Sequence, residues 1–423
     1  MQGLAMRSEV EAYGAIVVPP DVMVPYQKHS DVLDQPQARH FASVTFIYLL
    51  VGSTVFFYPF ALLIDRFVGR IGYHDSGVAW NAFMYSAAMH VAMTAIFYVD
   101  PAMFALMRHN RIRFMAIAPL AFLGTFWLWT LGTSRTQAYF MLAYVLWTYW
   151  HFQKQHWGVY SFVRIHEKSR PQSIDRLVVV YGSYLPAAII WGTSTIASGG
   201  NAEFFWSPVV RAANVINHFA LPIVVMSAAA AVYAIVREVR SARSAGRPIA
   251  VLSLAMLAFF SCNNWPFLIF DVDSLAIAMV NTGHGLQYII FMTVFAYDRN
   301  RVYRLLDKER PAGSLASAVS RRIDARWLGH IVGVLYLVGM VAGANWLFHG
   351  GYARALKSAF FVGLTLSTGQ MALVAQALGL AITVVHYILD ASAWRLTQPE
   401  ARAVMRQKFD FIFSRQARPG VGV

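Results

Sequence analysis

The sequence predicts an all-α membrane protein, a polytopic bundle of about ten transmembrane helices. Of its 423 residues, 57% are hydrophobic and only 13% are charged, whereas a soluble protein carries about 25% charged residues. The apolar residues gather in segments of about 20, the length with which a helix crosses a bilayer. Within these segments they surround the helix instead of alternating with polar residues, which disfavours strands.

Ten segments between residues 41 and 392 have the length and composition of a membrane span. They are 41–64, 78–98, 114–133, 137–162, 177–197, 209–236, 249–270, 273–297, 327–348 and 370–392. The apolar segment 353–368 is too short to span, so we expect an interfacial or re-entrant piece there. All spans must share one membrane core, so residues 41–392 are expected to form a single domain with a basic cytoplasmic loop at 299–326.

The charges predict the orientation of this domain. Lys and Arg concentrate in the loops after the second, fourth, sixth and eighth spans and in the tail at 393–423, so both termini are expected in the cytoplasm. Arg66, Arg70 and the pair Arg354 and Lys357 are exceptions. Residues 1–40 lack the basic and apolar regions of a signal peptide and are expected to form a cytoplasmic arm. Because the basic residues are divided among loops, the net charge of +14 does not indicate nucleic-acid binding.

Histidines inside the spans point to a metal site. An ionisable group in hydrocarbon is costly unless it faces the protein interior and has a partner. His90, His151, His284 and His386 lie on four spans of the same direction, at depths that agree to about 5 residues, or roughly 7–8 Å of helix rise. Imidazoles converging from facing helices are what a metal site in a bundle requires. The chain has one cysteine, so thiolate clusters are excluded as ligand sets.

The fourth span contains the run WTYWHFQKQHWG, with His151 and Gln155 on one face of the helix. His156 lies five residues after His151, about 140° around the helix. We therefore expect one of them to be a ligand, and the other to support the ligands or to bind a second ion. The alternative is an aromatic interfacial helix end whose histidines bond to carbonyl groups.

The eighth and tenth spans offer further polar groups. Asn281, His284 and Tyr288 share one stripe, and Gly283 and Gly285 remove bulk beside the imidazole. His284 could instead be a simple interhelical hydrogen-bonder. His386 and Asp390 are four residues apart, so both can reach one cation, or Asp390 can orient the imidazole. Asp390 could instead cap the helix or pair with Arg395.

The candidate residues fall into two groups. Tyr288 and Gln155 are the candidate catalytic residues. The candidate metal ligands, drawn from the polar residues of the even-numbered spans, are His151, His284, His386, His90, His156, Asp390 and His218.

Three segments of the chain, WHFQKQHWG, HGLQY and HYILDASAWR, together resemble a bacterial family of His-rich multispanning membrane proteins without an assigned activity. More distantly, single histidines scattered over apolar helices resemble the prokaryotic membrane carotene-cleaving dioxygenases of the Brp/Blh type, which hold non-haem iron through histidines. The chain is longer and lacks their His-Phe-Gly box, so no ligand is carried over. The resemblance implies a multi-pass protein of the bacterial inner membrane.

The leading hypothesis is a membrane-embedded metalloenzyme, an oxidoreductase with non-haem iron, or with zinc or copper. Its substrate would be a lipid-soluble molecule such as a carotenoid, isoprenoid, quinone or fatty chain that enters from the membrane lipids. An aromatic wall near the ion is expected from Trp147, Trp150, Phe152, Trp157 and Tyr288.

Two other hypotheses remain open. A haem-binding electron-transfer protein could use His90 and His284 as axial ligands. A proton-coupled transporter could use the same mid-membrane His, Asn, Gln and Asp residues.

Overall fold

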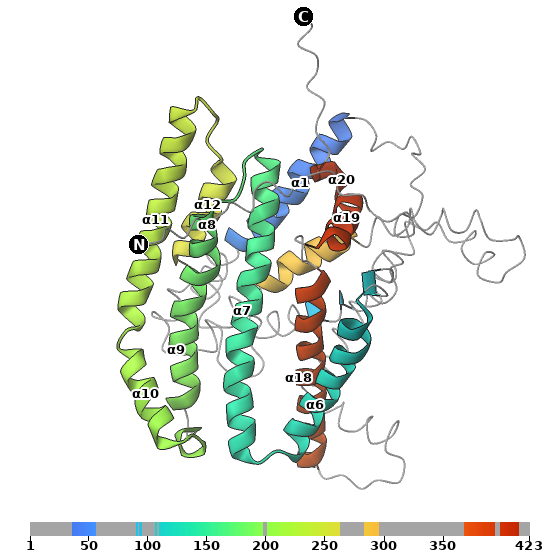
Figure 1. The fold of residues 1–423 in the computed structure, drawn as a ribbon, viewed down its shortest axis with the longest axis vertical. Helices are drawn as coiled ribbons and strands as arrows, with labels where there is room; N and C mark the ends of the chain where they lie inside the picture. The colour runs from blue at the N-terminus through green and yellow to red at the C-terminus, as the bar shows by residue number, and fades with distance from the viewer. Residues whose placement is uncertain are drawn as a thin grey trace, which may run out of the picture.

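A computed structural model describes residues 36–55, 90–91, 93–94, 106–107, 110–197, 201–262, 283–295, 368–393 and 398–413. In these residues all regular structure is helical, with no strand, so the all-α prediction is confirmed for this part of the chain (Figure 1). The expected span 327–348, most of the span 78–98, the loop 299–326 and residues 353–367 of the expected short segment lie outside the described residues.

Among the described residues, three helices are long and apolar enough to cross a membrane: Ile112–Leu131, Ser173–Thr193 and Ala220–Ser244. The first joins the π-helical turn η2 (Ile112–Ile117) to α6 (Ala118–Leu131). The second runs through α8 (Ser173–Arg176), η3 (Leu177–Gly182) and most of α9 (Ser183–Ala197). The third is α11 (Ala220–Ser244). Shorter apolar helices cover Ala42–Val55, Val251–Phe260 and Ala377–Ala391.

Helix α7 (Ser134–His166) is the centre of the bundle and lies between α9 and α18 (Thr368–Ala393) in Figure 1. It starts at Thr133, whose side chain accepts a hydrogen bond from the Thr136 N–H and so satisfies one backbone donor of the first turn. Its buried residues lie between Val145 and Arg164 and include runs of adjacent positions, so most sides of this part of the helix are covered by other segments. They include His151 and His156.

The expected span 209–236 is not one helix, which corrects the prediction from hydropathy. The chain forms α10 (Ser207–Asn217), turns at His218 and Phe219, and continues as α11. Pro222 explains the break, because its ring would clash with the carbonyl of His218 in a continuous helix and it has no N–H to donate to that carbonyl. The first half of the expected span is therefore a separate short helix.

Two basic loops lie at the same end of the bundle. Arg164, near the end of α7, pairs with Glu238 of α11 at 2.9 Å, and both side chains are buried. Glu167 accepts hydrogen bonds from the backbone N–H groups of Leu252 and Ser253, at 2.8 and 3.1 Å, and thereby caps α12 (Val251–Cys262). The loops that follow α7 and α11 are thus held together.

Part of the segment expected as a basic tail packs against the core. Helices α19 (Pro399–Lys408) and α20 (Asp410–Phe413) bring Phe409 into an aromatic cluster with α1 (Pro36–Val55), α7 and the helical residues 283–295. The Phe409 ring centroid lies 4.6 Å from that of Phe291, 5.4 Å from Phe162 and 5.5 Å from Phe46. Residues 399–413 are therefore anchored to the helices that build the centre of the protein.

Replacing Phe409 by Ala should release this anchor. Phe409 is fully buried, so the change is expected to lower the free energy of unfolding by roughly 3–5 kcal/mol. We expect a lower melting temperature in detergent and faster proteolytic cleavage of the C-terminal segment. Phe219→Ala, which truncates a ring that is 55% exposed, is the matched control. Equal effects of the two substitutions would contradict the anchoring.

Candidate metal centre

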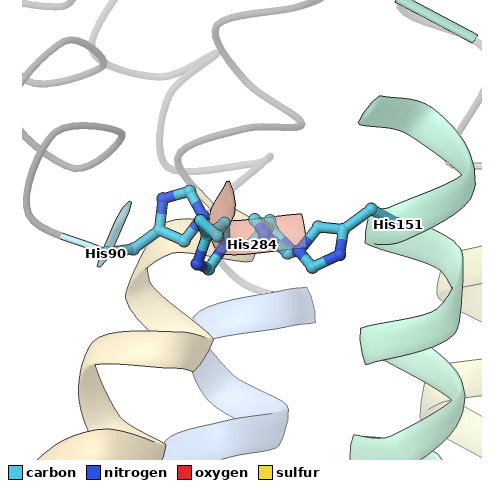
Figure 2. A group of neighbouring side chains, drawn as sticks. His90, His151 and His284 are labelled. Carbon is cyan, nitrogen blue, oxygen red and sulfur yellow. The ribbon is translucent and has the colours of Figure 1, made fainter. Parts of the chain in front are cut away.

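Four histidines from four separate segments meet in the core of the bundle. His151 comes from α7, His386 from α18, His284 from the helical residues 283–295, and His90 from the helical pair 90–91. One nitrogen of each ring lies within 4.8 Å of one nitrogen of every other ring. All four side chains are buried, with at most 6% of any residue exposed. Figure 2 shows His90, His151 and His284 pointing toward one another.

The rings pack edge to face around a common point. The ring centroid of His90 lies 4.8 Å from that of His284 and 4.6 Å from that of His386. His151 lies 5.2 and 5.1 Å from the same two rings. At these separations the four imidazoles cannot all carry a positive charge in an apolar surrounding, because the repulsion is not screened by water. The cluster is therefore suited to neutral imidazoles, the form that binds metals.

Several nitrogens of the cluster have no hydrogen-bond partner among the described residues. These are Nε2 of His151, Nε2 of His386 and both ring nitrogens of His284. Buried polar atoms in folded proteins are nearly always hydrogen-bonded, and each one left without a partner costs roughly 1–3 kcal/mol. A metal ion would satisfy several of these nitrogens at once, so the donor set fits a metal.

Asp390 adds a carboxylate to the same point. Its Oδ2 lies 3.6 Å from Nε2 of His151 and 3.7 Å from Nε2 of His386. Its Oδ1 accepts a hydrogen bond of 2.8 Å from the Tyr288 hydroxyl, which fixes the orientation of the carboxylate. Only 2% of Asp390 is exposed. A buried carboxylate requires a positive partner, and the position facing two imidazole nitrogens is one that a shared cation would complete.

Side chains outside the cluster hold the imidazoles in place. The Thr94 hydroxyl is hydrogen-bonded to Nδ1 of His386, which leaves Nε2 of that ring for the centre. An added Cβ on Gly283 would lie 3.7 Å from the Ser53 carbonyl oxygen, so the segment with His284 packs closely on α1. Gln287 donates a hydrogen bond to the Thr54 hydroxyl across the same contact.

Aromatic rings cover the imidazoles. The ring of Phe152 lies 4.1 Å from that of His284, and Tyr387 stacks on His151 at 4.4 Å. Of the expected wall, Phe152 and Tyr288 lie at the cluster. Trp150 instead contacts Tyr181 and Tyr184, Trp157 stacks on Tyr160, and Trp147 packs against Tyr387. Tyr387 and Thr94 are not among the sequence candidates; the adjacency of Tyr387 to His386 is the one signal that could have suggested it.

The remaining candidates take different positions. The Gln155 amide donates a hydrogen bond of 3.1 Å to the backbone carbonyl of His284, so it joins α7 to the neighbouring segment. The ring centroid of His156 lies 6.3 Å from that of His284, so His156 is a neighbour of the four-histidine cluster and not a member of it. Its Nδ1 lies 3.4 Å from Oε1 of Gln153. His218 is exposed at the end of α10 and does not belong to the buried cluster.

Replacing His284 by Ala should abolish metal retention, because it removes the ring that lies between His90 and His151. The fold should survive, since the helices keep their other contacts and water can fill the small polar cavity. Metal content of purified protein, measured by mass spectrometry beside a melting curve, checks this. His218→Ala removes an exposed imidazole and is the matched control. Equal metal content in the two variants would contradict the assignment of the cluster as a metal site.

Comparison with known proteins gives no relative from which to transfer a function. No protein family, no curated protein and no solved structure matches the chain. The structure itself establishes a buried cluster of four histidines that could hold a metal ion, in a helical chain with three candidate membrane spans.

Proposed function

We propose that the chain is a membrane-embedded metal-dependent oxidoreductase in which His90, His151, His284 and His386, with Asp390 beside them, hold a metal ion. The observation that carries this proposal is the convergence of four buried imidazoles whose ligand nitrogens lie within 4.8 Å of one another. A cluster of this kind is difficult to account for by packing alone, because it leaves buried nitrogens without hydrogen bonds.

The donor set supports iron. Imidazole and carboxylate ligands suit Fe(II), Zn(II) and Cu, and the combination of both is typical of non-haem iron oxygenases. When bound, iron would supply the activation of molecular oxygen for oxidation of a substrate. Tyr288 would keep Asp390 directed at the centre, and Thr94, bonded to Nδ1 of His386, would orient that ring so that Nε2 faces the centre.

The surroundings of the cluster favour a lipid-soluble substrate. Phe152, Tyr288 and Tyr387 border the imidazoles, and such walls fit an apolar molecule better than a charged one. A carotenoid, isoprenoid, quinone or fatty chain could reach the centre from the bilayer between helices.

The proposed location is the bacterial inner membrane, with ten spans and both termini in the cytoplasm. The three candidate spans support a membrane location. The pairing of Arg164 with Glu238 and the cap that Glu167 forms on α12 support the orientation, because they hold two basic loops at one end of the bundle.

A haem is not favoured by the geometry. Its macrocycle would have to separate two axial imidazoles, yet each ring of the cluster lies 4.6–5.2 Å from two others. A haem inserted at this point would displace the rings that do not bind it.

The transporter hypothesis shares the same polar residues and differs in requiring no metal.

The proposal is tested on protein purified in detergent with its native lipids. We expect stoichiometric iron, an absorption spectrum without a Soret band, and oxygen consumption that depends on an added lipid-soluble substrate. His386→Ala should remove both iron and oxygen consumption. Asp390→Asn should cause nearly complete loss if the carboxylate binds the metal, and a milder loss if it orients His386.

Two results would overturn this function. A Soret band would show that the protein binds haem. Protein that holds no metal and still drives proton-dependent uptake of a solute would assign a transporter.

A further inference from the structure

A stripe of buried polar side chains runs along α7 from the metal centre toward the basic end of the bundle. Gln153, His156, Tyr160 and Arg164 follow one another at spacings of three or four residues, so they share one face of the helix. Each is at most 3% exposed. The proposed metal site uses none of them, and four buried polar side chains in one line of a helix require a reason.

The inner end of the stripe lies beside the histidine cluster. His156 is next to His284 and is in contact with Gln153, whose Nε2 has no hydrogen-bond partner among the described residues. Ser183, at the start of α9, is fully buried, and its hydroxyl likewise has no partner in the described part of the chain. Trp150 contacts both Tyr181 and Tyr184, which places Ser183 within about one helical turn of the level of Gln153.

The outer end of the stripe reaches charged groups close to the surface. Tyr160 lies within electrostatic range of the side chains of Asp175, Arg164 and Glu238, and its hydroxyl has no hydrogen-bond partner among the described residues. Arg164 pairs with Glu238 at 2.9 Å and donates a hydrogen bond of 3.0 Å to the backbone carbonyl of Arg170, which is an exposed residue. At the basic end of the bundle, the buried network therefore contacts an exposed residue, Arg170, directly through Arg164.

The backbone of a segment that packs against α7 is irregular next to Ser183. The π-helical turn η3 (Leu177–Gly182) leads into α9, and it packs against α7. Pro186 cannot donate the helical hydrogen bond to the carbonyl of Gly182, so the regular ladder is interrupted beside Ser183. π-helical turns occur frequently at functional sites, where they expose polar backbone to the interior.

We propose that the stripe is a hydrated path that carries protons between the basic end of the bundle and the metal centre. Side chains three or four residues apart on a helix are about 5–6 Å apart, a gap that one bridging water can span. Buried water binds where two to four polar partners are available, and the amide of Gln153, the hydroxyls of Ser183 and Tyr160 and the imidazole of His156 provide them.

The path answers a requirement of the proposed function, on which this inference rests. Reducing one molecule of oxygen to two of water takes up four electrons and four protons, and oxidation of a lipid-soluble quinol releases one proton for each electron that it gives up. The hydrocarbon around the centre cannot hold these protons, so a buried centre that releases and takes them up needs a polar connection to an aqueous phase. Asp175 and Glu238 would be the groups where protons enter, and the path itself transfers only protons.

The hydration of the path is tested by X-ray hydroxyl-radical footprinting of the full chain in lipid nanodiscs, because this method labels side chains that contact internal water. Tyr160 and Tyr149 are both fully buried on α7, but Tyr149 packs in an apolar cluster with Phe152 and Trp191. We expect severalfold more label on Tyr160 than on Tyr149. Equal and negligible labelling of the two tyrosines would overturn the proposal.

Variants separate a water path from simple helix packing. Ser183→Ala should reduce the labelling of Tyr160, whereas Ser161→Ala, which removes a hydroxyl bonded to the Trp157 carbonyl, should not. Tyr160→Phe should keep the metal but slow substrate-dependent oxygen consumption severalfold, and Tyr149→Phe should leave it unchanged. Labelling unaffected by Ser183→Ala, or full oxygen consumption in Tyr160→Phe, would contradict the path.

Metal analysis of the same samples distinguishes failure of this inference from failure of the proposed function. If the protein holds no metal but Tyr160 is labelled, the stripe is hydrated and the proposed oxidoreductase function is wrong. If the protein holds metal but Tyr160 is not labelled, the metal centre is supported and the water path is wrong.

Discussion

The burial of four imidazoles at one point of an apolar bundle is the constraint on which the rest of the structure depends. Each ring nitrogen that is removed from water without a new partner costs roughly 1–3 kcal/mol, and several lie within 4.8 Å of one another. A metal ion bound by these nitrogens, as we propose, would offset this cost and would stabilise the meeting of four segments that are far apart in the sequence.

Contacts between helices surround this meeting point. Gln155 joins α7 to the backbone of His284, the segment that contains Gly283 packs on α1, and Tyr288 joins this segment to Asp390 of α18. These contacts cross between segments that are far apart in sequence. These hydrogen bonds between segments would orient the proposed ligands before a metal binds, so binding would require little rearrangement of the side chains.

The sequence suggested that His90, His151, His284 and His386 lie at similar levels, because the rise of a helix per residue is fixed, and the structure brings these four residues together. It also placed His156 away from His151, because five residues turn a helix by about 140°. It could not show that Tyr387 stacks on His151, since that contact depends on how α18 is rotated. His218 was grouped with the ligands because hydropathy overlooks Pro222, which ends α10 and leaves this imidazole exposed.

X-ray absorption spectroscopy at the edge of the bound metal tests the central claim most directly, since it reports the atoms around the ion in purified protein. The account predicts nitrogen and oxygen neighbours with the multiple-scattering pattern of several imidazoles and no sulfur. It also predicts that this pattern is lost in a variant with His151 and His386 both replaced by Ala. A spectrum with sulfur neighbours, or one without imidazole scattering, would contradict the assignment of the four histidines as a metal centre.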